Sequence, residues 1–266
     1  MCGRYSIVSS ITQIEKRFNV RSKEQEYSNP NIGPGEFAPV ITGSERKQLQ
    51  FFKFGLTPSW AKKQMHVINA RSEGDRNQDN DPEYHGSMGI IMKPMFKGLI
   101  RRQRCLVIAD AFMEGSQKDK LSKPFLVFPR DKKRPFAMAG IWDSWEDPIS
   151  GEPLNSFAIL TTSANDLLQK IGHHRSPLVL PPYLEGTWLN GRYLADITGI
   201  MKPFNPHFFN AYPISNVIKD VTNKDIELLN PIGDRLYLET KMIPQKLSYE
   251  EKQRRRRANL YGKNEN

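Results

Sequence analysis

The chain contains 266 residues, and its 39 Lys and Arg residues exceed its 29 Asp and Glu residues to give a formal net charge of +10. Hydrophobic residues make up 38% of the chain and aromatic residues 10%, which is typical of a folded globular protein. No apolar run reaches the ~18 residues of a membrane span, and the N-terminus lacks the pattern of a secretory signal. With only two cysteines, Cys2 and Cys105, the composition excludes a disulfide framework and favours the cytoplasm.

The positive charge is concentrated at the C-terminus. From Lys241 onward, eight Lys and Arg residues and three Glu residues give +5, and Arg254–Arg257 form the centre of this basic run. Such an excess favours a polyanion such as a phosphate backbone as a partner, although a solvated tail has the same composition. We therefore divide the chain into one domain over residues 2–235 and a basic, flexible tail over residues 236–266.

Hydrophobic patterning predicts a single α+β domain. The sequence Ser10–Gln13 matches a capping box, and the helix that follows it has an apolar face of Ile11, Ile14 and Phe18. Runs rich in β-branched and aromatic residues predict strands at 48–54, 104–109, 124–128, 136–142 and 156–161. Shorter patterns predict helices at 95–102, 165–170, 182–190 and 224–229, and a long surface loop at 74–89. Because strands and helices do not alternate, we expect a mostly antiparallel, barrel-like β-sheet with short peripheral helices.

The first residues of the chain, Met1-Cys2-Gly3-Arg4, carry unusual chemistry. If Met1 is removed, Cys2 holds an α-amine with a pKa near ~8 beside a thiol with a pKa near ~8.5. With an aldehyde, the amine forms a Schiff base and the thiol closes a five-membered thiazolidine ring. An internal cysteine such as Cys105, which we expect to be buried in a strand, cannot do this. A cysteine that merely follows the start codon is the alternative.

Two further segments join polar groups to apolar strands. The peptide Ile68–Glu73 contains Asn69, whose amide can bind an oxyanion or a sugar hydroxyl, and Arg71, which can bind a phosphate with two hydrogen bonds. Glu114 ends a strongly apolar segment, where partial desolvation would raise its pKa and suit it to proton transfer. A simple turn and an outward-facing strand residue are the respective alternatives.

The sequence His173-His174-Arg175-Ser176-Pro177 offers an imidazole beside a guanidinium. The imidazole suits acid–base catalysis and the arginine suits phosphate binding, although a surface turn before proline has the same composition. The two cysteines are far apart and the five histidines show no ligand spacing, so we predict no metal site and no cofactor.

Together these segments resemble one family, the SRAP (SOS response-associated peptidase, or abasic-site processing) domain, over roughly residues 2–235. The motifs that carry the resemblance occur in the order of that family: Met1–Arg4, Asn31–Gly35, Phe54–Trp60, Ile68–Glu73, Arg104–Glu114, His173–Leu180 and Val217–Pro231. The resemblance implies a DNA damage protein of the SOS response that senses abasic sites in single-stranded DNA and protects them by a covalent crosslink. It also implies possible lyase and self-processing peptidase activity, and a nucleoid association in a bacterium.

The same resemblance assigns roles to individual residues. Cys2 forms the thiazolidine, Asn69 holds the ring-opened sugar or the amine, Glu114 acts as general acid and base, and His173 helps to open the sugar ring. Its DNA-binding residues here are Arg4, Pro34, Trp60, Arg71 and Arg175; the arginines contact flanking phosphates, and Pro34 and Trp60 support the neighbouring bases. We expect abasic single-stranded DNA as the partner, with no membrane and no obligate protein partner.

The chain departs from the family pattern at three points. Gly115 stands where the family usually has a tryptophan after its glutamate, His174 where an aspartate is common, and Ser176 where a larger residue is common. The glycine removes a base-stacking surface, but none of the three changes removes a proposed catalytic group.

Two other functions fit parts of the sequence. Glutamine amidotransferases with an N-terminal nucleophile also begin Met-Cys-Gly, and there Cys2 would attack a glutamine amide. These enzymes usually continue with a glycine-rich strand and need a synthetase partner, and the sequence indicates neither. The third possibility is a non-catalytic single-stranded nucleic-acid-binding module that uses the basic surface alone.

Overall fold

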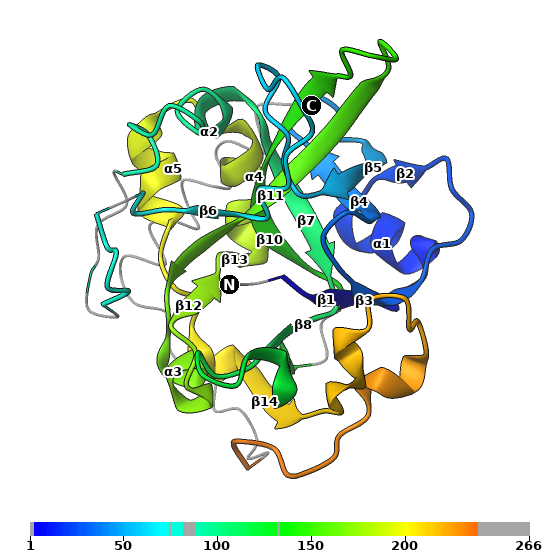
Figure 1. Ribbon diagram of the computed structural model, residues 1–266, viewed down its shortest axis with the longest axis vertical. Helices are drawn as coiled ribbons and strands as arrows, with labels where there is room; N and C mark the ends of the chain where they lie inside the picture. The colour runs from blue at the N-terminus through cyan, green and yellow to red at the C-terminus, as the bar shows by residue number, and fades with distance from the viewer. Residues whose placement is uncertain (1–2, 75, 82–83, 85–88, 132–133, 239–266) are drawn as a thin grey trace.

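The computed structural model describes residues 3–74, 76–81, 84, 89–131 and 134–238 (Figure 1). Cys2 and the basic run Arg254–Arg257 therefore lie outside the described residues. The described part is an α+β domain in which most strand pairs are antiparallel, as the sequence predicted. None of its helices has the length and apolar character of a membrane span.

The described strands form two sheets. The smaller sheet has the order β14 (Phe209–Pro213), β9 (Phe125–Pro129), β8 (Ala111–Glu114), β1 (Tyr5–Ile7) and β3 (Asn29–Ile32). The larger sheet has the order β12 (Arg175–Pro177), β11 (Pro153–Ser163), β10 (Phe136–Glu146), β7 (Arg104–Ala109), β4 (Phe37–Thr42), β5 (Gln48–Phe54) and β2 (Arg21–Ser22). In addition, β6 (Asn69–Arg71) pairs in parallel with β11, and β13 (Val179–Leu180) pairs with β10.

The two sheets enclose one main core, which gives the predicted barrel-like arrangement. The ring of Tyr5 on β1 packs edge-on against Phe54 on β5, with centroids 5.6 Å apart, and Phe54 stacks on Phe157 of β11 at 5.3 Å. All three rings are fully buried, so this aromatic column joins the smaller sheet to the larger one. Between β7 and β8, the buried Asp110 accepts hydrogen bonds from the backbone N–H groups of Val8 and Ser9 at 2.7 Å, which fixes the chain just after β1.

The helices are short and peripheral. They are α1 (Ile11–Phe18), α2 (Leu99–Arg102), α3 (Asp166–Ile171), α4 (Pro182–Asn190) and α5 (Leu194–Ile200), with 3₁₀ turns η1 (Lys120–Ser122), η2 (Pro206–Phe208), η3 (Asn216–Lys219) and η4 (Ile226–Leu229). The capping box predicted for α1 is present, because the Ser10 hydroxyl accepts from Gln13 N–H and the Gln13 side chain accepts from Ser10 N–H.

Several predicted boundaries differ from the structure. Residues 95–98 of one predicted helix form hydrogen-bonded turns before α2, and residues 224–225 of another precede the 3₁₀ turn η4, which Asp225 caps. At the predicted boundary with the tail, Leu236 N–H donates to Ala211 O of β14 at 2.8 Å, and Tyr237 is bonded to Asn210. The contacts with the domain thus extend to Tyr237, beyond residue 235.

Candidate functional site

The centre of the candidate site is a buried pair formed by Glu114 and His173. Glu114 is the last residue of β8, and His173 follows Gly172, the left-handed residue that ends α3. The imidazole Nε2 lies 3.2 Å from the carboxylate Oε2, and the two side chains are only 6% and 5% exposed. The other ring nitrogen, Nδ1, lies 2.8 Å from the carbonyl oxygen of Gly115. Because a carbonyl oxygen can only accept a hydrogen bond, we assign a proton to Nδ1.

Burial determines the protonation of His173. Desolvation is the main reason why the pKa of His173 falls to about 3, and nearby positive charge, including that of Arg175, acts in the same direction. The ring is therefore neutral near pH 7 and presents Nε2 to Glu114 as an acceptor. Nε2 and the Glu114 carboxyl group thus lie within hydrogen-bonding distance of each other, an arrangement suited to proton transfer.

The N-terminal strand runs alongside Glu114. In the antiparallel pair of β1 and β8, Tyr5 lies opposite Phe112, and the pairing continues with a 2.9 Å hydrogen bond from Met113 N–H to the carbonyl oxygen of Arg4. Continued by one residue, this register brings Gly3 level with Glu114. The chain thus enters the domain beside the Glu114–His173 pair.

Asn69 and Arg71 lie on β6, on the same side of that strand. Both side chains are half-buried, whereas Ala70 between them is fully buried on the opposite side. Within the larger sheet, β6 and β12 lie on either side of β11, since Arg71 and Pro177 both pair with Thr161. The segment that carries Asn69 and the segment that carries His173 are therefore separated by one strand, as Figure 1 shows.

Arg175 lies behind this surface rather than on it. Its guanidinium donates two hydrogen bonds of 2.8 Å to the carboxylate of Glu73, and the two side chains are only 1% and 2% exposed. Burial raises the pKa of Glu73, but the hydrogen bonds and charge of Arg175 outweigh this effect and hold the pKa below its usual value. In this placement the charge of Arg175 is buried and paired with that of Glu73, and its contact with a DNA phosphate stays a prediction.

Arg4 is half-buried between the N-terminal strand and the C-terminal segment. Its Nη2 donates to the carbonyl oxygen of Lys219 at 3.0 Å, while Nη1 is buried and has no hydrogen-bond partner among the described residues. Desolvation lowers the pKa of Arg4, and the charges of Glu36 and Asp220 partly oppose this. A side chain at position 33 would collide with the guanidinium, which explains Gly33 in the loop beside Arg4.

Pro34 and Trp60 both lie on the surface. Pro34 is exposed in the loop between β3 and β4. Trp60 is 64% exposed. The residue before it, Ser59, is anchored by a 2.8 Å hydrogen bond from its backbone N–H to the buried carboxylate of Asp143. The turn is fixed and its indole ring faces solvent, which is the placement that base contact requires.

Gly115 allows the chain after Glu114 to fold back closely. A Cβ atom at this position would lie 1.6 Å from the carbonyl oxygen of Lys120, so η1 occupies the place where a side chain would project. The same residue supplies the carbonyl oxygen that orients His173. The sequence marked Gly115 as a departure but did not reveal this supporting role.

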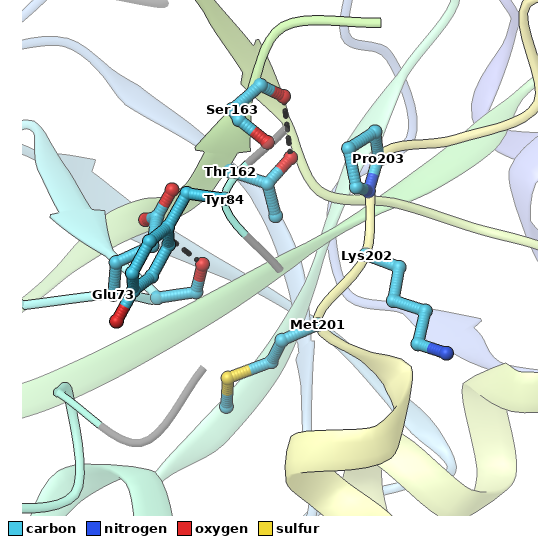
Figure 2. Close-up of a pocket in the computed structure, with 8 residues that line it drawn as sticks. Glu73, Tyr84, Thr162, Ser163, Met201, Lys202 and Pro203 are labelled. Carbon is cyan, nitrogen blue, oxygen red and sulfur yellow. Dashed lines mark hydrogen bonds between the residues drawn. The ribbon is translucent and has the colours of Figure 1, made fainter. Parts of the chain in front are cut away.

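A cavity of 410 Å³ adjoins the Glu73–Arg175 pair on the Glu73 side (Figure 2). Its lining residues are Ser72, Glu73, Tyr84, Thr162, Ser163, Met201, Lys202 and Pro203. Apart from Glu73 and Ser72, these residues lie in segments without a recognisable motif, so sequence reasoning missed the cavity. Within the part of the chain that the structure describes, no group of three or more His, Cys, Asp or Glu side chains is arranged to hold a metal ion.

The chain is similar to proteins of one family. The model of the family described as "SOS response associated peptidase (SRAP)" matches residues 1–221. The chain is 28% identical over 238 residues to abasic site processing protein YoqW of Bacillus subtilis (strain 168), covering 86% of this chain and 99% of the relative. It is also 28% identical over 282 residues to abasic site processing protein HMCES of Gallus gallus, covering 87% and 78%. A crystal structure of a protein from Bacteroides thetaiotaomicron superimposes with a TM-score of 0.73 at 26% identity, covering 86% of this chain and 99% of that one.

Proposed function

Because the chain belongs to the SOS response associated peptidase (SRAP) family, we propose that it captures abasic sites in single-stranded DNA through a covalent bond to Cys2. The relatives from Bacillus subtilis and Gallus gallus are named abasic site processing proteins, which supports an abasic site as the substrate. The observation that carries the proposal is the register of β1 on β8, which brings Gly3 level with the buried Glu114–His173 pair.

The proposed reaction uses both nucleophiles of Cys2. Removal of Met1, a hydrolytic step of the peptidase type, frees the α-amine. The amine attacks the aldehyde carbon of the ring-opened sugar, and loss of water leaves a Schiff base. The thiol sulfur then bonds to the imine carbon while its proton passes to the nitrogen, which closes the thiazolidine. Because Cys2 is covalently bonded to Gly3, which lies level with Glu114, this scheme has the Glu114–His173 pair act on the carbon that Cys2 attacks.

In this scheme Glu114 gives and takes the protons. It protonates the oxygen that leaves as water and, in the reverse direction, assists reopening of the ring. His173 acts at an earlier step, the opening of the closed sugar to the aldehyde, and Asn69 holds the opened sugar or the amine. The Schiff base also permits elimination of the phosphate on the 3′ side, which is the proposed lyase activity.

The DNA contacts that we propose are fewer than the sequence predicted. Arg4 and Arg71 remain as phosphate ligands, because each is only half-buried and Arg4 carries a donor without an acceptor among the described residues. Trp60 and Pro34 offer exposed apolar surfaces to unstacked bases, a contact available only in single-stranded DNA. Arg175 serves instead to hold β12 in place.

Mass spectrometry of the intact protein, with and without an oligonucleotide that contains one abasic site, tests the proposal. We expect mature protein without Met1, and a covalent adduct equal to protein plus DNA less one water. Cys2→Ala, also freed of Met1, forms no stable adduct, whereas Cys105→Ser, a control at a fully buried thiol, forms the adduct. Active protein that retains Met1 would refute the proposal.

A further inference from the structure

We propose that the β9–β14 edge of the smaller sheet is a second contact surface for the phosphate backbone of single-stranded DNA, outside the lesion site. The proposal rests on the proposed function in one respect, since it takes the strand that flanks the captured lesion as the occupant. The surface consists of Arg130, Arg134, Lys170, Phe208 and Tyr237, and we call it the β14 edge. None of these residues belongs to the motifs that carry the family resemblance.

Aromatic rings hold the cations of the β14 edge in place. The guanidinium of Arg130 lies 5.2 Å from the ring centroid of Tyr237, and the ammonium nitrogen of Lys170 lies 4.5 Å from the same centroid. Arg134 lies over the neighbouring Phe128 at 5.5 Å. Stacking on a ring leaves the N–H groups at the edge of a guanidinium free to bind phosphate oxygens.

The positive charge of this edge is not neutralised within the described residues. Arg130, Arg134 and Lys170 form no ion pair there, although Asp131 and Asp234 are close to them in sequence. The Nε donor of Arg130 is buried and has no acceptor in the same part of the chain. The like charges of Arg130 and Lys170 both lie close to the ring of Tyr237, and the positive potential that they add to this edge favours an anion.

An exposed ring adjoins these cations. Phe208, which ends η2, is 44% exposed, and its carbonyl oxygen accepts a 2.9 Å hydrogen bond from Arg130 N–H. A solvent-facing aromatic ring next to stacked cations is the combination that binds single strands without sequence preference, because bases stack on the ring while phosphates meet the charges. This combination favours a nucleic acid over a small anion.

The β14 edge continues from the lesion site. Lys170 lies in the last turn of α3, three residues before His173, and α3 packs beside β14 (Figure 1). From the opposite direction, Phe125 of β9 pairs with Glu114, and Arg130 lies five residues further along, or ~17 Å at the rise of a strand. A strand bound at Glu114 and extended over this edge stays within the ~4–16 nucleotides that a single-strand-binding surface covers.

The test compares undamaged oligonucleotides of about 5 and about 15 nucleotides, a range typical of single-strand sites. The variant Arg130→Gln/Lys170→Gln removes two charges from the β14 edge, and Lys16→Gln/Arg21→Gln removes two exposed charges from α1 and β2 as a matched control. We expect the first variant to lose about 20-fold in affinity for the long oligonucleotide near 0.1 M salt, with a salt slope about 1.4 smaller. Affinity for the short oligonucleotide should stay within twofold of wild type.

Equal losses in both variants, or an unchanged long-strand salt slope in the first, would overturn the proposal. Phe208→Ala provides an independent readout, because loss of stacking should weaken long-strand binding without changing the salt slope. If Arg130→Gln/Lys170→Gln does not fold, Arg134→Gln on the exposed turn takes its place, with a slope reduction of about 0.7 expected. Adduct formation by wild-type protein is measured separately, so failure of the crosslinking proposal leaves this test standing.

Discussion

The carboxylate of Glu73 accepts two hydrogen bonds from the guanidinium of Arg175, and this ion pair joins the end of β6 to β12 across β11. Because Asn69 and Arg71 lie on β6 and His173 lies two residues before β12, the pair fixes the two halves of the candidate site relative to each other. Arg175 also donates to the hydroxyl of Thr161 on the strand between them. Arg175, which the sequence predicted as a phosphate ligand, thus supports the scaffold of the site in this structure.

Glu73→Gln should therefore destabilise the protein strongly. The substitution leaves the charge of Arg175 buried without a counter-charge, for which we expect a loss of ~3–5 kcal/mol in the free energy of unfolding. Urea denaturation measures this value. Lys123→Gln serves as a control at an exposed ion pair with an N–O distance of 3.7 Å, and should cost less than ~1 kcal/mol. Similar small losses in both variants would show that Glu73–Arg175 contributes no specific support.

Stability should fall as the pH is lowered, and His173 should account for part of the fall. The pKa of His173 is about 3 in the folded protein against an ordinary value of 6.5, so between these pH values the unfolded chain binds more protons than the folded one. By linkage, the free energy of unfolding then decreases as pH falls, by up to ~1.4 kcal/mol per pH unit for one proton. Denaturant unfolding at a series of pH values should show a shallower dependence for His173→Gln than for wild type. The lowered pKa of Glu73 contributes in the same direction at lower pH and should persist in that variant.

Gly115→Ala should disturb both the fold and the chemistry. The new methyl group would meet the carbonyl oxygen of Lys120, so η1 must move, at a cost of ~1–3 kcal/mol for overpacking. Because the Gly115 carbonyl orients His173, crosslinking should slow as well. Gly186→Ala is the control, since a Cβ atom there meets nothing within 4 Å inside α4, and the change should be neutral or stabilising by ~0.5–1 kcal/mol. An unchanged crosslinking rate in Gly115→Ala would show that crosslinking does not depend on the orientation of His173 by this carbonyl oxygen.

Arg71→Ala should weaken DNA binding without unfolding the protein. Its side chain is half-buried, and its hydrogen bond to the carbonyl oxygen of Asn77 is long at 3.4 Å, so little of the fold depends on it. Loss of one phosphate contact should reduce the salt slope of single-strand binding by about 0.7. Binding is compared at several salt concentrations with Arg102→Ala, an exposed arginine at the end of α2, as the control. A salt slope equal to that of the control would show that Arg71 makes no phosphate contact and has a structural role instead.

The sequence predicted those elements whose signals are local. The capping box of Ser10 and Gln13 predicted α1, and runs rich in β-branched and aromatic residues predicted β5 and β7 with the bounds that the structure has. Cys105 is fully buried on β7, as its apolar neighbours indicated. Short strands such as β1 and β8 were missed, because a few residues carry little periodicity and their pairing partners are distant in the chain.

In the candidate site too, the sequence predicted the residues with local signals but not their contacts with distant parts of the chain. Residue chemistry identified Glu114 and His173 as acid–base candidates. Nothing local indicated that their side chains lie 3.2 Å apart, because 58 residues lie between them in the chain. Charge alone could not separate Arg71, half-buried on β6, from Arg175, which Glu73 neutralises in the interior. Which charges are paired in the interior depends on the tertiary structure, and the sequence around each residue does not show it.

The final prediction separates the roles of Glu114 and His173. Glu114→Gln keeps the size of the side chain but cannot exchange a proton, so it should slow Schiff-base formation on every substrate, by the ~10²–10⁴-fold typical of positioned proton transfer. His173→Ala should slow capture of a natural abasic site, whose sugar is mostly closed, more than capture of an oligonucleotide with a preformed aldehyde, because only the former needs ring opening.

Single-turnover crosslinking of both variants on both substrates measures this difference, and equilibrium binding of undamaged DNA serves as the control for affinity. If His173→Ala is equally slow on the two substrates, ring opening is not its step. The 3.2 Å contact would then mean that His173 acts through Glu114, orienting its carboxyl group for the later steps.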